Sequence, residues 1–348
     1  MFRFPLLIGD IGGTYCRFAV IPEEGAAPAL PVIIDTSAHR SPSDALRSVL
    51  PELGAPAPRA AFLGVAGRVS SPVIRMTNAP WVWDAADIAA TLGLEQVVLV
   101  NDYVPVAALL PLLPPEQPPG FAVLGRPANR SEGIRIALGP GTGLGASACI
   151  PVEGRYWLQP TEAGHVSFGA CDDSDFGLWP HLERVHGRVS AETLLSGPGL
   201  VRLYRALSAR QQQRTICSTP ADVVTEANAR PESLAGQAVR LFAALLGRYA
   251  GDLALIFGAR GGVFFSGGVL PRIRGWLESG HFRREFENKA PFELLMREIP
   301  TALITVPEPA MAGLARIANS PGLFSFEHHG WSGQRRNRDI DPPGSNSN

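Results

Sequence analysis

The chain has 348 residues, of which 45% are apolar, and its formal net charge at pH 7 is −1. A chain of this length usually forms two packed units, each able to bury a sizeable core. The near-neutral charge and the lack of a basic block exclude nucleic acid as the main partner, because phosphate neutralisation needs clustered Lys or Arg. No apolar run reaches about 18 residues, and Asp10 interrupts the apolar opening, so we expect no membrane span, no secretion signal and a cytoplasmic protein.

The basic residues are unevenly chosen, since only Lys289 among 31 Lys and Arg residues is a lysine. A Walker A loop and a protein kinase both place a lysine on the phosphates, and the Glu-Asn-Lys-Ala-Pro context of Lys289 fits neither. If the chain handles ATP, glycines and carboxylates must therefore bind it.

The first hundred residues alternate predicted strands and helices. Two apolar strands within 3–21 are expected to form a hairpin around the turn 10–14. Ser43 is a suitable N-cap for a helix to Leu50, and Asp84 for a helix that Gly93 ends. Further strands are expected at 31–34, 60–65 and 96–100, which gives the order β-β-β-α-β-α-β.

A comparable plan restarts after the proline-rich segment 111–119, which predicts a domain boundary. Strands are expected at 121–124, 134–138, 146–150 and 263–266, with a long helix from Ser233 to Phe257. We therefore expect a small α/β domain over 1–112 that a helix near 308–320 completes, a large α/β domain over 113–307, and a disordered tail over 329–348.

Three glycine clusters follow predicted strands: Gly12-Gly13-Thr14, Gly139–Gly145 and Gly267-Gly268. Successive backbone N–H groups without side chains can converge on phosphate oxygens. Each cluster could also be an ordinary turn, although four glycines within Gly139–Gly145 weaken a strand connection unless a ligand or a positive φ requires them.

Two acidic positions also follow strands. Asp10 could hold a magnesium ion through its waters, or it could cap the neighbouring turn. Asn101 and Asp102 follow a buried strand, where open α/β sheets place ligand groups. Asp102 could accept a hydroxyl proton, or it could be the N-cap of a helix over 104–110.

Glu162, His165 and Glu192 are further polar candidates, since carboxylates accept strong hydrogen bonds from sugar hydroxyls. The Glu-x-x-His spacing also occurs in di-metal helices, but those need a second copy, and Pro160 and Gly164 disfavour a helix here. We therefore expect no metal site at Glu162 and His165, and His165 could instead be structural.

Taken together, these segments resemble the bacterial glucokinase family, ATP-dependent hexokinases of the actin-like, ribonuclease H-like ATPase fold. The resemblance runs from about residue 6 to about residue 317. Its parts occur in the family's order: Leu7–Thr14, Thr77–Trp81, Val100–Tyr103, Gly139–Gly145, Glu162–Val166, Val189–Leu200 and Gly261–Arg272.

The resemblance implies two ribonuclease H-like α/β domains with a cleft between them that takes glucose and MgATP, in a homodimer. It implies that Asp102 is the general base on the sugar 6-hydroxyl. It further implies sugar contacts from Asn78, Asn101, Glu162, His165 and Glu192, phosphate contacts from Gly12, Gly13, Thr14, Gly141, Thr142 and Gly143, adenosine contacts from Gly267 and Gly268, and Asp10 near magnesium.

The chain departs from the family pattern at Ala163, where Glu-Gly-Gly-His is common, and the effect depends on whether that position needs φ > 0. The related repressor and sugar kinase group has clustered zinc cysteines after this motif, whereas only Cys171 follows here, so the resemblance is to the zinc-free glucokinases. The alternatives are a kinase for another hexose, a sugar sensor without catalysis, and an ATPase without a sugar acceptor.

Overall fold

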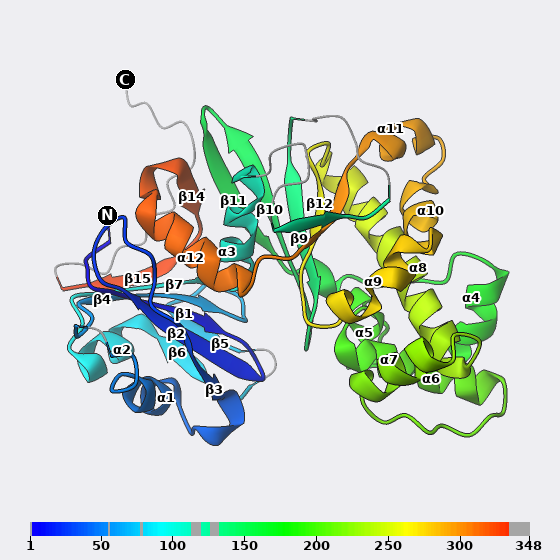
Figure 1. Cartoon of the computed structure of the whole chain (residues 1–348), viewed down its shortest axis with the longest axis horizontal. Helices are drawn as coiled ribbons and strands as arrows, with labels where there is room; N and C mark the ends of the chain where they lie inside the picture. The colour runs from blue at the N-terminus through cyan, green and yellow to red at the C-terminus, as the bar shows by residue number, and fades with distance from the viewer. Residues whose placement is uncertain (1, 55, 77–78, 113–119, 126–131, 334–348) are drawn as a thin grey trace. The chain divides into compact units, whose positions relative to one another are not determined.

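The computed structural model describes residues 2–54, 56–76, 79–112, 120–125 and 132–333. The internal contacts divide the chain into two compact units, which are described separately (Figure 1). Each unit combines β-strands with helices, which confirms the predicted α/β class. The first unit comprises Met1–Leu109, Val152–Pro160 and Glu308–Asn348, and the second comprises Leu110–Pro151 and Thr161–Pro307.

The first unit contains a six-stranded sheet with the order β15-β7-β4-β1-β2-β3. The strands β1 (Leu6–Ile11) and β2 (Tyr15–Ile21) form the predicted antiparallel hairpin and are buried along most of their length. The predicted strands β4 (Ala60–Val65) and β7 (Gln96–Asn101) extend the sheet parallel to β1, and β3 (Val32–Asp35) pairs antiparallel with β2. Continuous apolar runs such as β4 are typical of strands that are covered on both faces.

Helices cover both faces of this sheet. The helices α1 (Pro42–Val49) and α2 (Ala85–Leu92) lie on one face (Figure 1). On the other face, α3 (Tyr103–Ala108) and α12 (Pro309–Asn319) pack against each other and against β1, β4 and β7. The strands β1, β4 and β7 are parallel, so their carboxyl ends lie at the same edge of the sheet, and α3 begins directly after β7.

The helix caps of the first unit follow the sequence with one exception. Asp84 caps α2 by accepting hydrogen bonds from two backbone N–H groups, and Gly93 ends the helix in the left-handed conformation, as predicted. The prediction that Ser43 caps α1 is wrong, because the cap is Ser41. Pro42 suits the first helical position, because an N–H there would have no partner within the helix and proline has none to leave unpaired. The helix therefore begins two residues earlier in the chain than predicted.

Three short strands of the first unit differ from the sequence expectations. The antiparallel pair β5 (Val73–Arg75) and β6 (Val82–Asp84) interrupts the predicted strand order, because three residues are too few to show a periodicity. The predicted disorder of 329–348 is wrong at its start, since β15 (His329–Ser332) pairs antiparallel with β7. Trp331 packs against the core there, whereas the Arg, Pro and Ser residues that suggested disorder come later; residues 334–348 lie outside the described residues.

The second sheet has the order β14-β11-β10-β9-β12-β13-β8. The four predicted strands of this half are confirmed, with ends shifted by a few residues. Strands β9 and β10 both extend into the glycine cluster between them, so that only residues 141–143 remain as the turn. The strands are β8 (Phe121–Val123), β9 (Arg135–Pro140), β10 (Leu144–Val152), β11 (Arg155–Thr161), β12 (Gly262–Phe265), β13 (Thr301–Ile304) and β14 (Phe324–Phe326).

The long helix α8 (Leu234–Phe257) is the centre of the helical layer in the second unit (Figure 1). Ser233 caps it and Gly258 ends it, as predicted, and its buried side chains pack against α6, α7 and α10. The other helices of this unit are α4 (Asp173–Leu178), α5 (Ala191–Leu194), α6 (Gly197–Arg210), α7 (Pro220–Ala229), α9 (Arg274–Glu278), α10 (His281–Glu287) and α11 (Glu293–Glu298). Single-turn 3-10 helices lie at Thr36–Ala38, Leu110–Leu112, Ala163–His165, Trp179–His181, Leu270–Ile273 and Pro321–Leu323.

One segment departs from the predicted domain ranges. Val152–Pro160 falls within the predicted large domain but belongs to the first unit by its contacts, and its strand β11 pairs in parallel with β14 of the same unit. Among the described residues, no helix combines the length and the apolar character needed to cross a membrane.

Candidate active site

Asp10 lies near the carboxyl end of β1, directly opposite Arg17 in the hairpin. Its side chain is 20% exposed, and its Oδ2 lies 3.6 Å from Arg17 Nη1. The same arginine pairs with Glu308, which precedes α12 in the left-handed conformation. Burial raises the pKa of Asp10 to about 6; the charge of Arg17 opposes that shift and the charge of Glu308 adds to it.

The surroundings of Asp10 fit a hydrated magnesium ion. The described residues contain no cluster of three or more His, Cys, Asp and Glu side chains that could hold a metal directly. Magnesium suits such a place, since it keeps most of its water and needs few protein ligands. Because burial leaves the charge of Asp10 poorly compensated, a nearby cation would stabilise its ionised form.

The glycine turn after β1 is closed by its own backbone and braced by Thr36. Gly12 N–H donates to the carbonyl of Tyr15 over 3.0 Å, and a Cβ on Gly12 would lie 2.9 Å from that oxygen. Thr36 donates its hydroxyl to the Gly12 carbonyl and its N–H to the Thr14 carbonyl. Gly13 is half-buried and Thr14 is exposed. The turn is therefore fixed in place while its tip faces solvent.

Asn101 and Asp102 follow from the end of β7 into α3. The buried amide of Asn101 donates to the Gly67 carbonyl over 3.3 Å and accepts from the N–H of Tyr103 over 3.0 Å. Asp102 stands at the N-cap position of α3, but its side chain makes no capping hydrogen bond. Asp102 therefore occupies the N-cap position, as the alternative interpretation expected, but Asn101 rather than Asp102 bonds the first helical N–H.

The parallel strands bring these two ends together. Asp10 pairs in register with Gly64 on β4, and Val65 pairs with Asn101 on β7. The N–H of Asp102 donates to the Val65 carbonyl over 3.2 Å. Asp10 and Asp102 thus lie at the carboxyl end of the parallel strands β1, β4 and β7, where open α/β sheets bind ligands.

In the second unit, Glu162 precedes the 3-10 turn Ala163–His165, and His165 is the last residue of that turn. Glu162 Oε2 lies 3.7 Å from His165 Nε2, and the two side chains are 49% and 45% exposed. A Cβ on Gly164 would lie 2.3 Å from the Leu144 carbonyl oxygen, so this glycine is required by close packing. Ala163 is not among the residues with positive φ, so its methyl group meets no backbone strain.

Glu192 lies in the first turn of α5, where Ser190 and Thr193 form a capping box. Its Oε2 accepts a 2.8 Å hydrogen bond from the N–H of Leu144. Leu144 is the first residue of β10 and follows the turn Gly141-Thr142-Gly143. The carboxylate of Glu192 is therefore hydrogen-bonded to the first residue of β10, the strand that follows the glycine turn.

The turn itself is held on both sides by backbone contacts. Gly141 N–H donates to the Gly143 carbonyl, and Gly197 N–H, at the start of α6, donates to the Gly141 carbonyl, both over 2.8 Å. Gly267 has φ +115°, and a Cβ there would lie 2.2 Å from the Pro140 carbonyl oxygen. The space beside Gly141 and beside Gly268 is open. The second unit thus gathers the turn, Gly267, Gly268 and Glu192.

The predicted site residues are divided between the units. Asp10, Gly12, Gly13, Thr14, Asn101 and Asp102 belong to the first unit, and Gly141, Thr142, Gly143, Glu162, His165, Glu192, Gly267 and Gly268 belong to the second. Asn78, which was expected to contact the sugar, lies outside the described residues.

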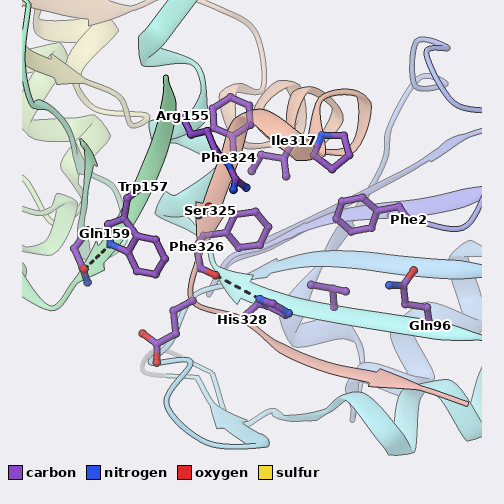
Figure 2. A pocket seen from close by; sticks show the side chains of 13 residues that line it. Phe2, Gln96, Arg155, Trp157, Gln159, Ile317, Phe324, Ser325, Phe326 and His328 are labelled. Atoms are coloured by element: carbon purple, nitrogen blue, oxygen red, sulfur yellow. Dashed lines mark hydrogen bonds between the residues drawn. The ribbon is translucent and has the colours of Figure 1, made fainter. Parts of the chain in front are cut away.

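A pocket of about 510 Å³ in the first unit contains none of these residues. Among its lining residues, only Glu327 is acidic. It therefore lacks the several carboxylates expected around a sugar. Figure 2 shows aromatic side chains and two basic ones around it: Phe2, Trp157, Phe324, Phe326, Arg155 and His328.

Sequence reasoning missed the charged partners of Asp10. Arg17 could have been found, since a hairpin that closes between Gly12 and Tyr15 pairs residue 10 with residue 17. Glu308 had no such signal, because it comes from a segment almost 300 residues away in the chain. Glycine at position 164 stands in a recognised motif, but its contact with Leu144 depends on tertiary packing.

Comparisons with known proteins extend over nearly the whole chain. The family model described as Glucokinase matches residues 7–321. The chain is 40% identical to a glucokinase of Sinorhizobium medicae over 329 residues, which cover 94% of this chain and 96% of that protein. It is 38% identical to a glucokinase of Mesorhizobium japonicum over 329 residues, which cover 94% of this chain and 95% of that protein.

Solved structures share the fold. A glucokinase from an Antarctic psychrotroph has a TM-score of 0.75 and 29% identity, covering 91% of this chain and 100% of that chain. A ROK family glucokinase from Streptomyces griseus in complex with glucose and AMPPNP has a TM-score of 0.62 and 19% identity, covering 90% of this chain and 99% of that chain, and shows the fold alone. The predicted actin-like, ribonuclease H-like fold is confirmed.

Proposed function

The chain belongs to the glucokinase family, and from that membership we propose that it transfers the γ-phosphate of ATP to the 6-hydroxyl of D-glucose, giving glucose 6-phosphate and ADP. The observation that carries this proposal is the 40% identity to a glucokinase over 94% of the chain. The carboxylates of Asp10, Asp102, Glu162 and Glu192 support it, because each stands in a segment that resembles the family pattern.

The sugar contacts are assigned to the polar side chains that the family pattern marks. Asn101, Glu162, His165 and Glu192 would bind the hydroxyl groups together with Asp102, and the family pattern adds Asn78. The exposure of Glu162 and His165 supports this role, since both side chains are accessible to a ligand. Ionised carboxylates suit it because they accept stronger hydrogen bonds from hydroxyls than neutral groups do.

The nucleotide contacts are assigned to the glycine turns. The backbone N–H groups around Gly12, Gly13 and Thr14, and around Gly141, Thr142 and Gly143, would bind the phosphates, and Gly267 and Gly268 would lie against the adenosine. The open space beside Gly141 and Gly268 supports a close approach. A single lysine in the chain agrees with phosphate binding by backbone groups.

Asp10 would hold Mg²⁺ through water molecules. When bound, this ion would supply charge neutralisation at the phosphates. The protein would contribute to catalysis by orienting the sugar and the nucleotide and by excluding water. Asp102 would accept the proton of the 6-hydroxyl as the oxygen attacks the γ-phosphorus, and its place directly after the carboxyl end of β7 supports this role.

The test is a coupled assay of ADP release with MgATP against glucose, mannose, fructose, glucosamine, N-acetylglucosamine and no sugar. We expect a kcat/KM for glucose well above that for every other sugar. A higher kcat/KM for another hexose would move the specificity, and sugar binding without ADP release would favour a sensor over an enzyme.

Two further assignments accompany the proposal. The enzyme would act in the cytoplasm, where ATP is available, and it would form a homodimer, as the family resemblance implies. Light scattering coupled to gel filtration tests the second assignment, which predicts twice the chain mass of 37.1 kDa.

A further inference from the structure

The segment that carries Glu162 and His165 is anchored by a helix that contributes no residue to the proposed site. This segment, 162–175, leaves β11, passes through the 3-10 turn and ends inside α4. Two consecutive residues of α8, Arg248 and Tyr249, contact it at separate points.

Tyr249 contacts the turn between the two proposed sugar ligands. Its hydroxyl donates a hydrogen bond to the carbonyl of Ala163, and the side chain is almost fully buried. Its ring meets Phe168 edge-on, with centroids 5.9 Å apart and an angle of 67°. Phe168 in turn bonds through its N–H to the carbonyl of Val189, three residues before Glu192. The tyrosine therefore ties the turn to α8.

Arg248 holds the far end of the segment through buried charges. Its guanidinium bonds to Asp175, and the two side chains are 11% and 2% exposed. Its Nη2 also lies 3.5 Å from Asp172 Oδ2. Asp175 Oδ2 accepts the N–H of Cys171 over 3.0 Å as well. A buried carboxylate that loses its cation is strongly destabilised, so this pair fixes the path of 171–175.

We propose that Arg248 and Tyr249 are positioning residues for sugar binding: they hold segment 162–175 so that Glu162 and His165 face the ligand in one geometry. The proposal rests on the assignment of Glu162 and His165 to the sugar site. Those two side chains are half-exposed and lie 3.7 Å apart, so their own contact is too weak to orient them. Their orientation must come from the backbone, for which α8 supplies two anchors beside the hydrogen bonds from Arg188 to the His165 carbonyl and from Ala191 to the Val166 carbonyl.

Two variants remove the anchors and one provides a matched control. Tyr249→Phe deletes only the hydroxyl, and Arg248→Met removes the guanidinium, with Arg248→Lys as the conservative replacement. The control is Lys289→Met, since Lys289 is a 10% exposed cation that pairs over 2.5 Å with Asp252 of α8 rather than with a carboxylate of segment 162–175.

The first readout is hydrogen exchange of the amides in 163–176, which needs no activity. We expect faster exchange there in Tyr249→Phe and Arg248→Met, but not in Lys289→Met. The second readout compares the KM for glucose with the KM for ATP. We expect the glucose KM to rise about threefold or more for Tyr249→Phe and about tenfold for Arg248→Met, with an unchanged KM for ATP and partial recovery in Arg248→Lys.

The two readouts separate the proposal from the proposed function. A wild-type protein that turns over no sugar would defeat the function, while hydrogen exchange would still decide whether α8 anchors the segment. Unchanged exchange in 163–176, or a glucose KM and an ATP KM that rise together in Tyr249→Phe and Arg248→Met, would overturn the positioning role.

Discussion

The backbone N–H of Leu144 donates a 2.8 Å hydrogen bond to the carboxylate of Glu192. Leu144 directly follows the turn Gly141–Gly143, whose first carbonyl accepts the N–H of Gly197. A residue assigned to the sugar and a turn assigned to the phosphates thus belong to one hydrogen-bonded element. A displacement of either is transmitted to the other, so sugar and nucleotide affinities should be coupled.

The first prediction concerns this shared element. Glu192→Gln weakens the bond to Leu144, because a neutral amide oxygen accepts a weaker hydrogen bond than a carboxylate. We expect the KM for glucose and the KM for ATP to rise together, each by about threefold or more. Initial-rate measurements with both substrates varied give both constants. A change in the glucose KM alone would contradict the coupling.

Glu162→Gln should behave differently. The carboxylate of Glu162 lies beside His165, whereas that of Glu192 bonds to the residue that follows the glycine turn. Loss of its charge should raise the glucose KM about tenfold or more and leave the ATP KM unchanged. Glu232→Gln, at a carboxylate that is 88% exposed in the same unit, is the control and should change neither constant. An unchanged glucose KM in Glu162→Gln would remove this residue from the sugar site.

Two glycines of segment 162–175, Gly164 and Gly169, provide a variant and its matched control. Gly164→Ala would place a methyl carbon 2.3 Å from the Leu144 carbonyl, whereas Gly169→Ala meets nothing within 4 Å. Gly164→Ala should therefore lower the unfolding free energy by about 1–3 kcal/mol and weaken glucose binding, because Leu144 must move. Gly169→Ala should leave both within error. Denaturant unfolding and calorimetric titration with glucose check these outcomes, and equal behaviour of the two variants would contradict the packing argument.

The raised pKa of Asp10 makes the stability of the ligand-free protein depend on pH. Burial raises that pKa from 3.8 to about 6, so the protonated form is favoured in the folded state. The corresponding stability is present below pH 3.8 and is lost as the pH rises through about 6. Asp10→Asn does not titrate and should be more stable than the wild type at pH 8, by up to about 3 kcal/mol.

This gain should disappear near pH 4, and kinase activity should be lost at both pH values. Thermal unfolding at a series of pH values measures the difference. A destabilised Asp10→Asn at pH 8 would show that the pair with Arg17 outweighs the burial of the carboxylate.

Local signals in the sequence were sufficient for much of the fold. The hairpin β1–β2 and the helix between Ser233 and Gly258 could be predicted because their turn, cap and stop residues are neighbours of the apolar runs that they bound. The strand β15 could not, since its four residues gain their structure from the exposed edge of β7.

The candidate site divides in the same way. The residue types at Asp10, Asp102 and Glu162 could be selected from their place after strands and in motifs. The bond from Leu144 to Glu192 joins residues 48 positions apart, and no local pattern encodes it. Position 163 was an open question in the sequence, and the ordinary backbone of Ala163 answers it, since only a positive φ would have required glycine.

The most direct test of the account is glucose 6-phosphate formation by the wild type and by Asp102→Ala in the same assay, with glucose binding measured on both samples. We predict that the wild type phosphorylates glucose and that Asp102→Ala binds glucose with little change but loses at least about 10²-fold in kcat, the contribution of a positioned general base. A wild type without glucose-dependent product, or an Asp102→Ala variant that keeps most of its kcat, would contradict it.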